Sequence, residues 1–220
     1  MKVQVIAAHP DDEILGVGGT VAMHVQRGDC VQLAILCEGV SVRYDPERQA
    51  EVRGQSLKAA SVLGVSNIIT QDFQDQGLDG RPIIEITREV EKLIQSFQPE
   101  TVYTQFGGDL NRDHRVLAEA VMVATRPYAA PFVREVLMYE TPSSTEWSSP
   151  HLSPMFQPHI FVDITSTLEK KLDAFACYAA EVCPEPHPRS LAALRQRAGY
   201  WGSLVNRAAA EPFVCVRSLR

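Results

Sequence analysis

The sequence predicts an α/β protein, a three-layer α/β/α sandwich with a Rossmann-like, mostly parallel sheet. Short apolar runs of strand length alternate with helical periods along the whole chain. Of the 220 residues, 45% are hydrophobic and 22% are charged, which suits one domain over residues 1–220 with a sizeable core. Strands that alternate with helices in this way pair in parallel and are covered by helices on both faces.

The first forty residues predict a strand, a helix and a second strand. Residues 2–8 form a short apolar run that contains β-branched side chains. A glycine-containing segment, 14–20, leads into a helix over 21–27, and residues 31–37 repeat the pattern of a buried strand. Parallel strands joined through a helix require a right-handed crossover, so this segment predicts a βαβ unit.

The alternation then continues to the end of the chain. Gly64 and Pro99 close the next two helices, because glycine ends a helix readily and proline cannot continue one. A Ser/Pro-rich loop is expected over 141–158. The expected helices are 46–63, 83–97, about 115–125, 168–179 and 191–205, and the expected strands are 67–70, 101–105, 133–139 and 159–164. With the two strands near the start of the chain, the expected strands number six.

The composition excludes several classes of protein. The formal net charge is −6, whereas a protein that binds nucleic acid usually carries an excess of positive charge. No apolar run reaches membrane-spanning length, and acidic residues follow the first strand too soon for a signal peptide, so we expect a cytoplasmic protein without an integral membrane segment. The five cysteines form no CxxC pair, so any transition-metal site must use imidazole and carboxylate groups.

The first candidate site follows the first strand. His9, Asp11 and Asp12 lie where an open α/β sheet binds ligands, at the carboxyl end of a strand. Buried carboxylates need compensation, and a divalent cation supplies it. Imidazole and carboxylate suit Zn²⁺, which uses three protein ligands in catalytic sites. Neighbouring aspartates point in different directions, so one can bind the metal while the other acts as a base.

A third ligand is expected after the strand 101–105. His114 lies near the start of the next helix, and Asp109 and Asp113 are close enough in sequence to fix the tautomer of an imidazole. The aspartates in both loops also have a purely structural explanation, because an aspartate just before a helix often serves as the N-cap of that helix. The occurrence of both patterns at strand ends favours a site.

These residues resemble the LmbE-like, or PIG-L, family of zinc-dependent N-deacetylases. Residues 8–13 (AHPDDE) and 107–115 (GGDLNRDHR) are similar to its two signatures. The likeness continues through 73–79, 139–147, 186–190 and 198–217, and therefore covers nearly the whole chain.

The resemblance implies that His9, Asp12 and His114 bind zinc and that Asp11 is the general base. Zinc lowers the pKa of its bound water from about 15.7 towards roughly 7, so Asp11 can take the remaining proton as the water attacks an amide carbonyl. The implied enzyme is a hydrolase that removes an N-acetyl, or other N-acyl, group from a small amino sugar or its conjugate.

The resemblance also implies roles outside the metal site. His187 fits a histidine that helps to stabilise the oxyanion, and Arg53 and Asp75 resemble residues that contact sugar hydroxyls. A surface turn and solvated charges are the alternative explanations for these three residues. Asn111 and Gln105 stand where relatives carry histidine, so oxyanion stabilisation would depend on zinc and His187.

The rival interpretation is a nucleotide- or ligand-binding module that uses residues 16–19 as a phosphate loop. The glycine spacing differs from a dinucleotide fingerprint and the preceding acids would repel phosphate, so close packing of the first helix explains these glycines better. A two-metal phosphatase or nuclease would need more ligands than the chain offers. Trp201 on the C-terminal helix leads us to expect a homo-oligomer.

Overall fold

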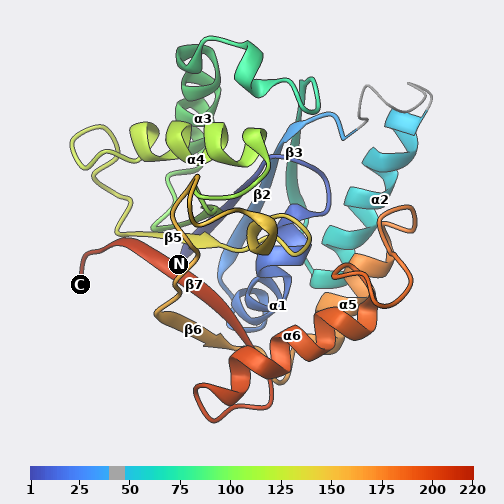
Figure 1. The fold of residues 1–220 in the computed structure, drawn as a ribbon. Coiled ribbons are helices and arrows are strands. Elements are labelled where there is room, and N and C mark those ends of the chain that lie inside the picture. Colours follow the sequence, from blue (N-terminus) through green and yellow to red (C-terminus); the bar gives the residue numbers. More distant parts are fainter. Residues whose placement is uncertain (40–47) are drawn as a thin grey trace.

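The protein is an α/β fold around a seven-stranded, mostly parallel sheet; the computed structural model describes residues 1–39 and 48–220 (Figure 1). The sheet order is β3-β2-β1-β4-β5-β7-β6. The first five strands in this order are parallel, and β7 is antiparallel to both of its neighbours. The strands are β1 (Lys2–Ala7), β2 (Cys30–Cys37), β3 (Asn67–Phe73), β4 (Thr101–Gln105), β5 (Glu135–Tyr139), β6 (Ile160–Asp163) and β7 (Ala210–Ser218).

Helices cover both faces of the sheet, which confirms the three layers. Along β1, Val3 and Val5 pack into one core with α1, α2, α5 and α6, whereas Ile6 packs into a second core with α3 and α4. This alternation follows from the two-residue period of a strand. The helices are α1 (Asp12–Gln26), α2 (Arg48–Leu63), α3 (Ile83–Phe97), α4 (Arg112–Ala124), α5 (Leu168–Ala176) and α6 (Leu191–Ser203), with short 3₁₀ helices η1 (Leu78–Gly80) and η2 (Thr145–Trp147).

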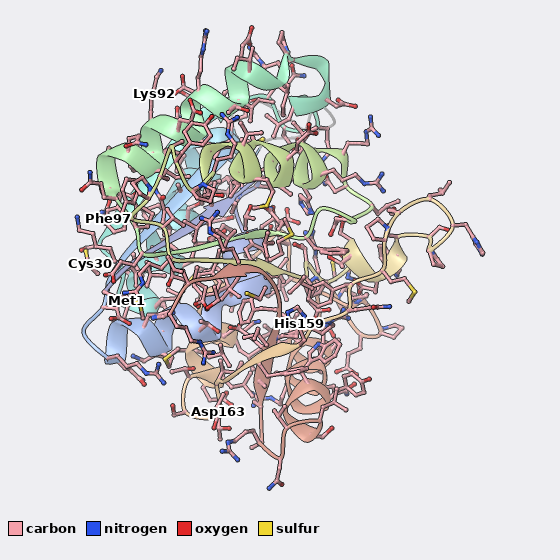
Figure 2. All side chains as sticks on the ribbon, turned by 90° about the vertical axis from the view of Figure 1, so that its left-hand side faces the viewer. Met1, Cys30, Lys92, Phe97, His159 and Asp163 are labelled. Carbon is pink, nitrogen blue, oxygen red and sulfur yellow. The ribbon has the colours of Figure 1, made fainter. Side chains whose placement is uncertain are left out.

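The candidate loops meet at the point where the strand order reverses. The chain passes from β1 to β2 and β3 on one side, and then returns to place β4 on the other side of β1. Met1 and Cys30, at the starts of β1 and β2, lie together at the amino end of the sheet (Figure 2). The loops after β1 and β4 therefore leave from the opposite end, on either side of a crevice that suits a ligand.

Three expectations about elements need correction. Strand β7 was not predicted, because Glu211 and Pro212 interrupt its apolar pattern. Helix α1 begins at Asp12, well before the expected start at residue 21, and α4 begins at Arg112 instead of Arg115. The first two residues of the helix expected over 46–63 lie outside the described residues. Among the described helices, none combines the length and apolar character needed to cross a membrane.

Candidate functional site

The loop after β1 holds two adjacent aspartates in different environments. Asp11 is the N-cap position of α1 and has a φ of 106°, a left-handed conformation that L-residues seldom adopt. Its backbone N–H donates to Glu13 Oε2 at 3.0 Å, and Glu13 Oε1 accepts a hydrogen bond from Tyr178 at 2.6 Å. The side chain of Asp11 contacts Arg189, whereas Asp12 turns towards the histidines. The two neighbouring carboxylates therefore contact different partners.

The loop after β4 places His114 in the first turn of α4. The side chain of Asn111 caps this helix by accepting the Asp113 N–H at 2.9 Å, which is why α4 starts earlier than its apolar pattern indicates. Asn111 therefore has a structural reason to replace a histidine. His114 and Asp113 are both almost fully buried.

Three side-chain donor atoms from the two loops converge on one point. His9 Nδ1 lies 3.1 Å from Asp12 Oδ2 and 3.2 Å from His114 Nε2, and His114 Nε2 lies 3.2 Å from Asp12 Oδ2. Ligand atoms held about 2.0–2.1 Å from a tetrahedral zinc ion are about 3.4 Å apart, so this nearly equilateral triangle fits such an ion. The two imidazole nitrogens face each other, an arrangement that a shared cation explains. The structure thus brings together the expected ligands His9, Asp12 and His114.

The electrostatics of the triangle also favour a positive charge. Burial lowers the pKa of His114, but the carboxylates of Asp12 and Asp109 outweigh it and raise the pKa to about 9. The pKa of His9 is raised in the same way, against burial, by Asp113, Asp12 and Asp75. Burial opposes ionisation of Asp12, yet both histidines hold its pKa well below the usual range. All three shifts favour positive charge at the centre of the triangle, where a bound cation would lie.

A further set of carboxylates fixes the two imidazole rings. His9 Nε2 lies 3.0 Å from Asp113 Oδ2 and 3.1 Å from Asp75 Oδ1. His114 Nδ1 lies 3.2 Å from Asp109 Oδ1, a close ion-pair distance although the two groups are not aligned as a hydrogen bond. Such partners orient the ligand rings and increase their basicity. Asp109 and Asp113 thus contact the rings of His114 and His9, respectively.

Three hydrogen bonds anchor these carboxylates to the rest of the protein. Asp113 Oδ1 accepts the Leu78 N–H at 3.0 Å, and Asp109 accepts hydrogen bonds from the hydroxyls of Ser144 and Thr145. Burial disfavours ionisation of Asp109, but His114 and these hydroxyls lower its pKa overall. The loop after β5 therefore helps to hold the imidazole of His114.

Gln105, at the end of β4, contacts the metal-ligand carboxylate directly. Its Nε2 donates to Asp12 Oδ2 at 2.7 Å, the same oxygen that lies between the two histidines. From the sequence, Gln105 was only a departure from the family pattern. An amide can replace a histidine here, because either side chain presents an N–H to the carboxylate.

A cavity of about 240 Å³ opens over the triangle and is polar in much of its lining. The expected residues His9, Asp11, Asp12, Asp75 and His114 line it, together with Arg189, Glu181, Ser143, Ser144, Asn111, Gln55 and Gln76 among others.

Of the residues expected to act in catalysis or to bind substrate, Arg53 and His187 do not line this cavity. The exposed Arg53, on α2, pairs with Asp72. His187 lies in a turn, where its Nδ1 accepts the backbone N–H of Arg189 at 3.1 Å and its ring meets Trp147 edge to face at 6.0 Å.

Sequence reasoning missed Arg189. It lies in the segment 186–190, which carries the family resemblance and in which His187 was the expected functional residue, because histidine is the commoner acid–base residue. Arg189 Nη1 lies 2.9 Å from Asp11 Oδ2. A buried carboxylate needs a cationic partner, and this requirement was the one signal in the sequence that pointed to an arginine.

The glycines of residues 16–19 lie inside α1 and serve packing. A Cβ on Gly16 would lie 2.0 Å from the ring of the buried Tyr139, and one on Gly19 would lie 2.8 Å from Ile164. This close packing is the simpler explanation anticipated from the sequence, and it removes the main observation in favour of a phosphate loop.

Comparison with known proteins agrees with this geometry. Residues 4–125 match the model of the family described as PIG-L, GlcNAc-PI de-N-acetylase. A probable N-acetyl-alpha-D-glucosaminyl L-malate deacetylase 2 of Bacillus anthracis is 25% identical over 190 residues, which cover 81% of this chain and 80% of that protein.

Two solved structures share the fold over nearly the whole chain. The N,N'-diacetylchitobiose deacetylase of Pyrococcus horikoshii has a TM-score of 0.79 at 21% identity and covers 98% of this chain and 84% of its own. The 4-carboxy-2-hydroxymuconate hydratase of Pseudomonas putida KT2440 has a TM-score of 0.74 at 22% identity, and the match covers 98% of this chain and 95% of the hydratase chain. The fold therefore serves more than one chemistry, and the family match and the site residues decide between them. The family model spans more than half of the chain and includes all three converging ligands, and on this evidence the chain belongs to the PIG-L family of metal-dependent N-deacetylases.

Proposed function

We propose that this protein is a zinc-dependent hydrolase that removes an N-acetyl, or similar N-acyl, group from a small amino sugar or its conjugate. The observation that carries the proposal is the triangle of His9 Nδ1, Asp12 Oδ2 and His114 Nε2, with sides of 3.1–3.2 Å, beside the carboxylate of Asp11 in one cavity.

The donor set favours zinc over other cations. Two imidazole nitrogens and one carboxylate oxygen suit Zn²⁺, whereas Mg²⁺ and Ca²⁺ prefer oxygen ligands. Three protein ligands leave a coordination position for water or substrate. When bound, zinc supplies Lewis-acid activation of water and of the amide carbonyl.

Asp11 has the position and environment of the proton carrier. Its carboxylate lines the cavity but takes no part in the ligand triangle. Burial raises the pKa of Asp11 well above its usual value, and Arg189 opposes this effect. A carboxylate whose pKa is raised towards neutral pH is a better general base. Asp11 accepts a proton from the attacking water as the carbon–oxygen bond forms, and it returns the proton to the nitrogen as the carbon–nitrogen bond breaks.

The lining of the cavity supports a small, hydroxyl-rich substrate. Asp75 is buried at the wall of the cavity, and its Oδ1 already contacts His9 Nε2, so only part of its carboxylate is free for a sugar hydroxyl. Gln55, Gln76 and Asn111 add amide groups. We keep Asp75 as a substrate-binding residue. For Arg53 the same role requires the arginine to release Asp72. A catalytic role for His187 requires its ring to reach the cavity from its turn.

The direct test is hydrolysis by the zinc-loaded protein. Purified protein is analysed for metal and incubated with N-acetylglucosamine, N,N'-diacetylchitobiose and an N-acetylglucosaminyl malate conjugate, while acetate and free amine are measured. We expect equal amounts of acetate and amine from at least one substrate, loss of activity with a chelator, and recovery with zinc. Absence of metal and of hydrolysis for all N-acetylated sugars would overturn the proposal, and a hydratase activity without acetate release would replace it.

A further inference from the structure

Arg189 connects the proposed base to two other parts of the chain. Its Nη1 lies 2.9 Å from both Asp11 Oδ2 and Glu181 Oε2, and its Nε donates to Ser143 Oγ at 2.7 Å. The side chain is one-fifth exposed and lines the cavity. One guanidinium thus joins the loop after β1, the loop after β5 and the segment before α6.

The orientation of the Asp11 carboxylate depends on this contact. Within the described residues, the Asp11 carboxylate accepts one hydrogen bond, which Arg189 donates to Oδ2. The backbone of Asp11 has a φ of 106°, which is unfavourable for aspartate and persists only where surrounding contacts hold it. Arg189 therefore fixes one carboxylate oxygen and leaves the other to face a reacting group.

Arg189 is itself held by a short hydrogen-bonded turn. His187 N–H donates to Pro184 O at 3.1 Å, Ser190 N–H donates to His187 O at 2.9 Å, and Arg189 N–H donates to His187 Nδ1. Ser190 then caps α6 by accepting the Ala193 N–H at 3.0 Å. The guanidinium consequently starts from a fixed backbone. His187 contacts this backbone instead of the cavity.

We propose that Arg189 is the positioning residue for Asp11, holding its carboxylate in the geometry required for proton transfer. This inference rests on the proposed function. A lysine could not reproduce the arrangement, because the contacts to Asp11 and Ser143 come from two different nitrogens of one planar group. A displaced base lowers the rate of the chemical step while substrate and zinc still bind to other residues.

The test compares Arg189→Met, Arg189→Lys and Arg189→Ala with the wild type. We expect kcat to fall by about 100-fold in Arg189→Met, because a displacement of the order of 1 Å has an effect of that size. We expect KM to change little and zinc content to stay at the wild-type level. Arg189→Lys should recover only a small part of kcat, and methylguanidinium should partly restore Arg189→Ala. Arg195→Met is the matched control, because Arg195 on α6 pairs with Glu169 on α5 at the protein surface. This variant should retain wild-type kinetics.

Each result bears on the inference. A kcat for Arg189→Met close to that of the wild type would overturn it, as would a variant that loses its zinc or its fold and is not rescued by methylguanidinium. If His187→Ala lowers kcat strongly while Arg189→Met does not, the histidine is the catalytic group and the inference fails. A wild-type protein that binds zinc but hydrolyses no N-acyl sugar overturns the proposed function, and the inference with it.

Discussion

His9 Nε2 lies 3.0 Å from Asp113 Oδ2, on the opposite side of the imidazole ring from the three converging donor atoms. This contact sets the ring plane and leaves Nδ1 free to bind a metal. The second oxygen of Asp113 accepts the Leu78 N–H, so the carboxylate cannot rotate away.

Asp113→Asn should weaken zinc binding by about 10- to 100-fold, the usual effect of losing such a partner. The variant keeps an oxygen for the Leu78 N–H, so it should still fold. Zinc affinity is measured by competition with a chromogenic chelator. Asp79→Asn is the control, because Asp79 is partly exposed and pairs with Arg112 at 3.6 Å. Equal affinities in Asp113→Asn and the wild type would contradict the assigned role.

Asp11→Asn should lower kcat by about 10²- to 10⁴-fold, the range for loss of a general acid–base group. Its zinc content should be unchanged, because Asp11 takes no part in the ligand triangle. His9→Ala, Asp12→Ala and His114→Ala should instead lose zinc. Measuring both zinc content and acetate release distinguishes the Asp11 variant from the three ligand variants. Near-full activity of Asp11→Asn would show that another group is the base.

Gly16→Ala and Gly54→Ala should have opposite effects on the free energy of unfolding. A Cβ at Gly16 meets the buried ring of Tyr139 and should destabilise the protein by about 1–3 kcal/mol. A Cβ at Gly54 meets nothing within 4 Å, so Gly54→Ala should stabilise α2 by about 0.5–1 kcal/mol. Urea denaturation measures both. A stabilised Gly16→Ala would contradict the packing of α1 on β5.

Lys171→Met should destabilise the protein by about 3–5 kcal/mol, because it leaves the buried Glu211 carboxylate without its cation. Lys171 Nζ lies 2.6 Å from Glu211 Oε1 and donates to Leu15 O at 2.8 Å, while Glu211 accepts the Gly19 and Thr20 N–H groups. The pair thus connects α5 and β7 to the backbone of α1. Lys92→Met, which removes an exposed i,i+3 pair, should change stability little in the same denaturation experiment.

His24 should make stability depend on pH near neutrality. Burial lowers the pKa of His24 below 6.5, against the influence of Asp29. The folded state therefore binds a proton less readily than the unfolded chain. The stabilisation is fully present above about pH 6.5 and is lost as the pH falls through the lower folded pKa.

The variant His24→Gln isolates this effect. It removes the titrating ring, so the difference in unfolding free energy between wild type and variant should shrink from pH 7 to about pH 5. Thermal or urea unfolding at several pH values measures it. A difference that stays constant or grows on acidification would contradict a neutral, buried His24.

The sequence predicted the parts of the structure that depend on local pattern. The five parallel strands, and the placing of His9 and His114 after two of them, follow from apolar periodicity and from polar residues at strand ends. The family resemblance was needed to choose Asp12 over Asp11 as the expected ligand. β7 was missed because Glu211 and Pro212 argue against a strand locally, and the neighbours β5 and β6 that pair with it come from distant parts of the chain. Arg189 also lacks a local signal, since its partner Asp11 is 178 residues away.

The place of β7 also has a consequence for the order in which the protein can assemble. It is the last strand in the chain, yet it lies between β5 and β6 and is the hydrogen-bonded neighbour through which β6 joins the sheet. During synthesis the amino-terminal part of a chain emerges first and begins to fold. The five parallel strands can therefore come together first, and they bring His9, Asp12 and His114 with them. β6 can join the sheet only after residues 210–218 have been made. The three candidate ligands can therefore converge before the carboxyl-terminal segment that carries Arg189 has docked.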